Sequence, residues 1–188
     1  MALKLDLSKA YDHVEWGFLR AMMGKMRFDT RFVELILATV DSIRYKIGPG
    51  SHQLGLIVPE RGICQGDPLS PNWFLIFAEG FSSLIRRFER DGRLRGYNSY
   101  VYCRANEKKT SNILHLLQLF EAASGQQVNF SMSSIFFSTN TPTDVRHQLY
   151  ALLGMGMAGE CSTYLGLPCT MGRNKDAILG FLKEKMHK

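Results

Sequence analysis

With 188 residues, the chain has the length of one domain, or of one domain and part of a second. Its composition, 45% hydrophobic and 21% charged, is that of an ordinary globular protein and argues against the disordered and fibrous classes. The formal net charge is +6 and is concentrated in one part of the sequence. No stretch approaches the run of about 20 apolar residues that a membrane helix needs, and no signal segment begins the chain.

Hydrophobic periodicity and turn residues predict strands and helices along the chain. In order, the expected elements are a strand within 2–7 that stops at Asp6, a helix over 13–27, a helix from Thr30, strands at 44–47 and 54–59, a helix over 72–90, a strand at 99–103, a helix over 106–124, a strand at 135–137, a helix between Pro142 and Gly154, and a helix from 174 onward. This mixture predicts the α+β class.

Local signals set some of these boundaries. Asp12 and Glu15 have the spacing of a capping box, which predicts the start of the first helix. Gly125 is expected to end the helix over 106–124. In the second helix, the apolar spacing predicts five inward-facing residues: Phe32, Val33, Ile36, Leu37 and Val40.

The charge and the cysteines indicate partners and compartment. Residues 86–109, here called the basic window, hold eight basic residues against three acidic ones, a net charge of +5. The basic residues are Arg86, Arg87, Arg90, Arg93, Arg95, Arg104, Lys108 and Lys109. This density of positive charge would suit a nucleic-acid partner, and the alternative is that the window is a solvated helix end and loop.

The four cysteines form no CxxC pair, so neither a zinc site nor a disulfide framework is indicated. We expect an intracellular protein, nuclear or cytoplasmic, with no membrane partner.

Two segments carry residue types with a chemical use. Asp6, at an expected strand end, could hold a hard cation such as Mg²⁺, although a lone Asp is more often a cap or a surface charge. Residues 65–71 form a turn rich in glycine and proline before a helix, where backbone amides could meet a phosphate. The alternative for this turn is a stiff connection in which Asp67 or Ser70 caps the helix.

Together these segments are far more specific. Residues 5–12 (Leu-Asp-Leu-Ser-Lys-Ala-Tyr-Asp) and 62–71 (Gly-Ile-Cys-Gln-Gly-Asp-Pro-Leu-Ser-Pro) resemble the first two catalytic motifs of reverse transcriptases. The resemblance is to LINE-type (non-LTR) retrotransposons, and the sequence looks like a plant one. Residues 120–130, 164–168 and 172–173 agree with the same family in the same order. The resemblance therefore covers essentially the whole chain.

The resemblance implies a polymerase palm that copies RNA into DNA with two Mg²⁺ (or Mn²⁺) ions. An RNA template, a DNA primer and deoxynucleoside triphosphates would be its partners. Asp6 corresponds to the catalytic, metal-binding Asp, and Tyr11 to the aromatic residue under the incoming sugar. Gln65 and Gly66 correspond to the turn along the template and the incoming nucleotide. The expected template-binding positions are Pro68, Ser70, Pro71, Arg86, Arg87, Arg93 and Arg95.

The sequence also departs from the family. The aromatic-Ala-Asp-Asp hairpin that supplies the other metal carboxylates is absent, and Tyr97 and Asn98 stand where its two Asp residues would be. The strand that leads to them is expected to be deleted, leaving unpaired strand edges. Met132 replaces a usual Lys, and Cys64 a common Arg. Because one carboxylate cannot fix two divalent cations, we expect a broken metal site.

The sequence thus predicts an incomplete palm over residues 1–140, followed by a palm–thumb connection and the start of a thumb-like helical region over 141–188. The favoured function is a remnant of an RNA-directed DNA polymerase, inactive as it stands. The first alternative is a non-catalytic nucleic-acid-binding module that uses the basic window. The second is a structural or interaction protein built from the surviving helices.

Overall fold

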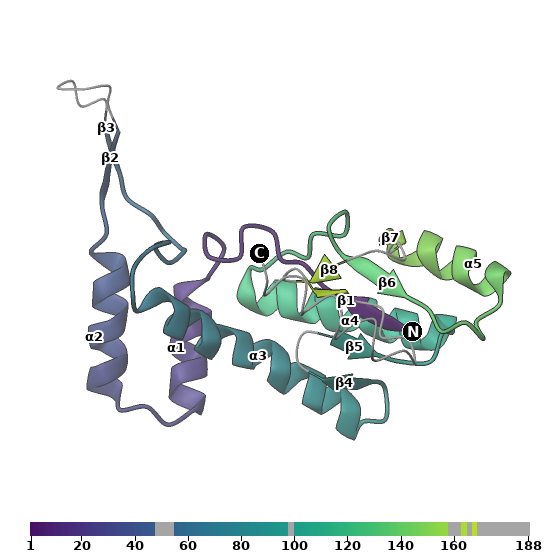
Figure 1. Cartoon of the computed structure of the whole chain (residues 1–188). Helices are drawn as coiled ribbons and strands as arrows, with labels where there is room; N and C mark the ends of the chain where they lie inside the picture. The colour runs from purple at the N-terminus through teal and green to yellow at the C-terminus, as the bar shows by residue number, and fades with distance from the viewer. Residues whose placement is uncertain (48–54, 98–99, 158–162, 165–166, 169–188) are drawn as a thin grey trace, which may run out of the picture.

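Helices and short strands alternate in the computed structural model, which describes residues 1–47, 55–97, 100–157, 163–164 and 167–168 (Figure 1). The helices are α1 (Trp16–Lys25), α2 (Thr30–Asp41), α3 (Ser70–Arg90), α4 (Glu107–Ser124) and α5 (Thr143–Leu153). The strands are β1 (Ala2–Lys4), β2 (Tyr45–Ile47), β3 (Gly55–Ile57), β4 (Arg95–Tyr97), β5 (Tyr100–Tyr102), β6 (Ser134–Phe136), β7 (Gly156–Met157), β8 (Thr163–Tyr164) and β9 (Leu167–Pro168). No helix of the described residues is long and apolar enough to cross a bilayer.

A five-stranded sheet in the order β4-β5-β1-β6-β7 carries the first core. β1 lies between β5 and β6 and is antiparallel to both, with Leu3 opposite Val101 and Ile135. These three side chains are buried on one face of the sheet, against Phe88 of α3 and Leu116 of α4. Since successive strand residues face opposite sides of a sheet, this register fixes which face each residue of β1 occupies.

A second core lies between α1, α2 and the N-terminal half of α3. Leu19, Met23 and Ile36 are buried there together with Trp73 and Phe77. α3 contributes to both cores, because Ile85 and Phe88 near its C-terminal end pack in the first. This one long helix therefore joins the helical part of the chain to the sheet (Figure 1).

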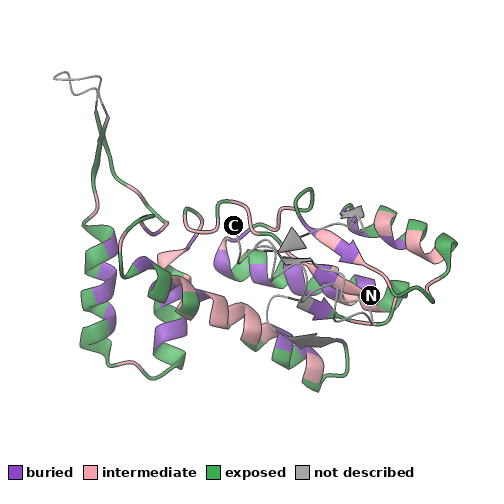
Figure 2. Ribbon diagram, in the orientation of Figure 1, coloured by how far each residue is buried: buried purple, intermediate pink, exposed green. Residues whose placement is uncertain are grey.

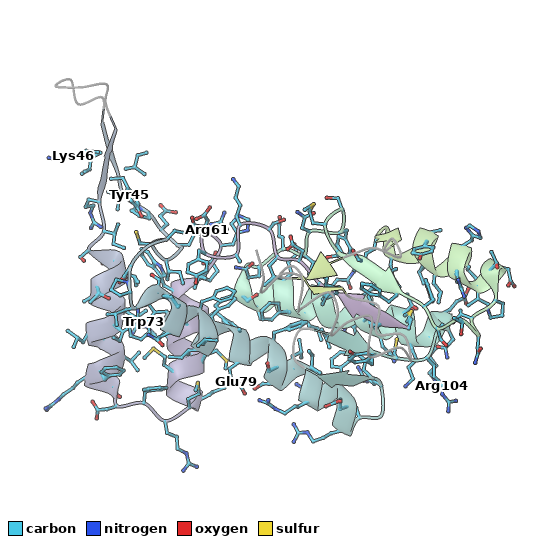
Figure 3. The ribbon with its side chains drawn as sticks, in the orientation of Figure 1. Tyr45, Lys46, Arg61, Trp73, Glu79 and Arg104 are labelled. Carbon is cyan, nitrogen blue, oxygen red and sulfur yellow. The ribbon has the colours of Figure 1, made fainter. Side chains whose placement is uncertain are left out.

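The hairpin of β2 and β3 projects from the helices (Figure 2), and Tyr45, Lys46 and the residues of β3 are exposed. Its strands are antiparallel, with Tyr45 opposite Ile57, as the sequence predicts for this segment. Lys46 extends from the hairpin into solvent in Figure 3, whereas Tyr45 lines a small pocket together with Cys64.

Several predicted boundaries are confirmed. α4 begins after Asn106, whose side chain accepts a hydrogen bond from the Lys109 amide at 2.9 Å. It ends at Gly125, which has a left-handed φ of +73°. α5 likewise ends at Gly154, with φ +62°. The helix expected from residue 174 lies outside the described residues.

Other expectations are wrong. α1 begins at Trp16 rather than at residue 13, and Glu15 at its N-cap makes no side-chain capping bond, so the capping box does not form. Phe32 is exposed and stacks on Phe28, with ring centroids 5.9 Å apart, instead of facing the core. The strand expected to be deleted is present as β4, which pairs with β5. β1 itself has partners on both sides, β5 and β6, so it leaves no unpaired edge.

Candidate functional site

Asp6 stands at the edge of the sheet where β1 ends. Lys4, two residues before it, is opposite Tyr100 of β5, and Tyr100 is opposite Tyr97, the last residue of β4. The register therefore brings Asp6 to the edge of the sheet where β4 ends at Tyr97 and β5 begins at Tyr100. The Asp6 side chain is exposed there.

The backbone around Asp6 is held by the loop between α4 and β6. The Asp6 amide donates to the Ser133 hydroxyl at 3.0 Å, and the Asp6 carbonyl accepts from the Asn129 amide at 2.8 Å. Further along, the Ser8 amide donates to the Gln127 carbonyl at 2.9 Å. Ser133 is 127 residues away in sequence, so tertiary pairing fixes this segment.

Tyr11 lies beside the segment that leads to the Gln65–Gly66 turn. Its carbonyl accepts from the Ile63 amide at 3.0 Å, and its ring stacks on Phe74, with centroids 5.1 Å apart and planes 10° apart. Residues Gln65 and Gly66 are both exposed, and Gly66 has φ +92°. The structure therefore brings the two segments singled out by the sequence into direct hydrogen-bonded contact.

Neither Asp67 nor Ser70 is the N-cap of α3, which is Leu69 and makes no side-chain capping bond, so the capping alternative for this turn is wrong. Asp67 instead holds the turn before the helix. Its carboxylate accepts from the Leu69 amide at 3.0 Å and from the Ser70 hydroxyl at 3.4 Å. Ser70 is buried and its hydroxyl is bonded to this turn, whereas Pro68 and Pro71 are exposed. Of the three template-binding residues expected in this turn, the two prolines are accessible to a template and Ser70 is not.

The basic template-binding positions lie near the other end of α3. Arg86 pairs with Glu79 and donates to the Ser83 hydroxyl at 2.9 Å, while Arg87 is exposed. Arg93 lies over the Phe88 ring at 5.2 Å from its centroid, and Arg95 begins β4. Sixteen residues of helix, about 24 Å, separate Ser70 from Arg86. The seven positions thus form two groups instead of one surface.

The positions that depart from the family motifs are distributed as follows. Tyr97 ends β4, and Asn98 lies outside the described residues. Met132 is 66% exposed and sits next to Ser133, which holds the Asp6 amide. Among the described residues, no group of three or more His, Cys, Asp or Glu side chains is placed to hold a metal ion.

Sequence reasoning missed two residues that hold the site, Ser133 and Gln126. Gln126 is fully buried, and its side-chain amide donates to the Ala10 carbonyl at 2.5 Å. The sequence marked residues 124–129 only for their resemblance to the family. A buried Gln next to an exposed one has no local sequence signal, because burial here depends on contact with a segment 116 residues away.

Gly62 provides a test of this packing. Its φ is +91°, and a Cβ there would lie 2.9 Å from the Asp12 carbonyl oxygen. We expect Gly62→Ala to lower the free energy of unfolding by about 2 kcal/mol, from left-handed strain plus the clash. Gly66→Ala is the matched control. Gly66 also has a positive φ, but a Cβ there would meet no atom within 4 Å, so the free energy of unfolding is expected to fall by only about 1 kcal/mol. Chemical denaturation measures both, and equal losses would contradict the close approach.

Comparison with known proteins gives one similarity, and no protein-family model matches the chain. Over 42 residues, the chain is 52% identical to an uncharacterized mitochondrial protein of Arabidopsis thaliana. The matched stretch is 22% of this chain and 34% of that protein. The chain is therefore similar, over a limited segment, to a plant protein, and it spans about a third of that relative's length.

Proposed function

We propose that the chain is a partial polymerase palm of LINE-type reverse-transcriptase ancestry that does not catalyse nucleotidyl transfer as it stands. One observation carries the proposal. Asp6 lies at the edge of the sheet where β4 ends and β5 begins, and the Tyr11 carbonyl accepts a hydrogen bond from the segment before Gln65 and Gly66. These are the segments that resemble the family motifs, and they are distant in sequence.

The described donor set does not fit the family's pair of Mg²⁺ or Mn²⁺ ions. Hard cations need several oxygen ligands each, and a pair needs more than one shared carboxylate to offset the repulsion between the ions. Asp6 is exposed, and within the described residues no cluster of acids surrounds it. The carboxylate of Asp67, the acid of the second motif, is engaged by the Leu69 amide and the Ser70 hydroxyl. We therefore assign no chemical step to a metal here.

Two measurements on the full chain test the proposal. With an RNA template, a DNA primer, all four deoxynucleoside triphosphates and Mg²⁺ or Mn²⁺, we expect no templated extension. Templated extension that disappears in Asp6→Asn would overturn the claim of inactivity.

Separately, fluorescence anisotropy should detect binding of a recessed RNA–DNA hybrid, and Gln65→Ala should weaken this binding several-fold. Gln127→Ala, at another exposed glutamine, is the control. Equal binding by Gln65→Ala and the unaltered chain would contradict the palm assignment.

A second candidate function is nucleic-acid binding without catalysis by residues of the basic window. The observation that favours it is a pocket into which this window folds. Two of the eight basic residues of the window, Arg104 and Lys109, line this pocket beside Glu89, Gly92 and Leu94.

A further inference from the structure

A pocket of about 730 Å³ lies at the end of the sheet opposite Asp6. It is lined by Met1, Glu89, Gly92, Leu94, Tyr102, Cys103, Arg104 and Lys109. In the register, Ala2 is opposite Tyr102 and Lys4 is opposite Tyr100, so the pocket adjoins the start of β1 and Asp6 follows its end. The pocket is therefore separate from the candidate site around Asp6.

Two cationic side chains line this pocket, and they differ in how firmly they are held. Arg104, just beyond β5, is exposed and projects outward beside the N-terminus (Figure 3). Lys109 is held in place, since its ammonium donates to the Gly92 and Arg93 carbonyls, each at 2.7 Å. An ammonium has three donors, so these two bonds leave one N–H that can reach an anion. Arg104 makes no ion pair with an acid among the described residues.

The pocket also offers flat and apolar surface. Tyr102 is 45% exposed, and Leu94 is buried in the pocket wall. Arg95 is at the register position opposite Tyr102 on β4. An exposed aromatic ring beside cations is the combination that binds unpaired bases, because the ring stacks on the base while the cations neutralise the phosphate. Glu89 is the one acid of the described lining.

We propose that this pocket binds one nucleotide of a single-stranded nucleic acid, with its phosphate at Arg104 and Lys109 and its base on Tyr102. The proposal rests on the second candidate function and holds whether or not the chain is a palm. A duplex is excluded as the ligand, because its bases are stacked and paired and do not enter a pocket without being extruded.

The neighbouring basic residues do not define the same site. Arg86 is paired with Glu79, and Arg93 lies over Phe88 and 3.9 Å from Asp91. Arg90 is exposed, belongs to the basic window and does not line the pocket. Replacing Arg90 removes the same charge from the same region, and Arg90→Gln is therefore the matched control for Arg104→Gln.

The test measures anisotropy of a fluorescein-labelled 12-nucleotide oligo(U) with the full chain over a salt series. Two phosphate contacts predict that log K falls with log salt with a slope of about −1.4, and Arg104→Gln should reduce this slope by about 0.7. Tyr102→Leu should weaken binding roughly tenfold with the slope unchanged. Arg90→Gln should change the affinity less than twofold. Far-UV circular dichroism and melting temperature establish that each variant is folded.

Each alternative result overturns the proposal. If Arg90→Gln weakens binding as much as Arg104→Gln, the basic window acts as a diffuse surface, and the second candidate function survives without the pocket. If Tyr102→Leu binds like the unaltered chain, no base stacks there. Duplex of the same length bound as tightly, or free uridine monophosphate competing as well as the oligonucleotide, would show that a single strand is not the ligand.

Discussion

Replacement of Phe77 by alanine is expected to lower the free energy of unfolding by about 3–5 kcal/mol. Phe77 is fully buried in α3, within the core that α3 shares with α1 and α2. Its ring packs edge-to-face on Phe18 at 5.0 Å and on Phe120 at 5.9 Å between centroids. Truncation removes both aromatic contacts and leaves a cavity, because three helices converge on this ring.

The matched control is Leu75→Ala, two residues earlier in the same helix. Leu75 is 66% exposed, so its truncation is expected to change stability by no more than about 0.5 kcal/mol. Urea denaturation followed by far-UV circular dichroism measures both. Similar losses for the two variants would contradict the position of α3 against α1.

The loss at Phe77 is large in relation to the whole domain. Net stability of a single domain is about 5–15 kcal/mol, so this one truncation would remove a large fraction of it. Phe120 belongs to α4, which also packs under the sheet through Leu116 and Leu117. We therefore expect Phe77→Ala to destabilise the sheet as well as the helices, with a single cooperative transition shifted to lower denaturant.

The elements that could be predicted from the sequence are those with local signals. α4 has a capping side chain at Asn106 and a left-handed glycine at Gly125, both within one turn of the ends they define. The start of α1 could not be predicted in this way. Asp12 has the right spacing for a cap, but its carbonyl lies against Gly62, and the Tyr11 carbonyl accepts from Ile63, so long-range pairing holds this segment outside the helix.

β4 shows the same limit for strands. Arg95–Tyr97 is only three residues long, and its extended conformation is defined by pairing with β5. A periodicity of two cannot be recognised over three residues, so the sequence could not distinguish a short strand from its absence.

In the candidate site, Asp6 and Gln65 were predicted through the family resemblance. Ser133 was not, because its role is a hydrogen bond to an amide 127 residues away.

Gln126→Ala tests the contact that holds the Asp6–Tyr11 segment, with an expected loss of about 3 kcal/mol in unfolding free energy. The side chain is fully buried, and its amide donates to the Ala10 carbonyl at 2.5 Å. Alanine leaves that carbonyl without its donor and opens a cavity beneath the turn. Gln127→Ala, at an exposed position whose backbone carbonyl alone is used by Ser8, should cost less than about 0.5 kcal/mol.

Hydrogen exchange separates this positioning role from a general loss of stability. If Gln126 fixes the turn, the Ser8 and Asp12 amides should exchange faster in Gln126→Ala by more than the global change requires, because local opening no longer breaks the Ala10 contact. The amides of α2, which Gln126 does not touch, should change only with global stability. A uniform increase across all amides would mean that Gln126 supports the core without specifically positioning the segment that carries Asp6.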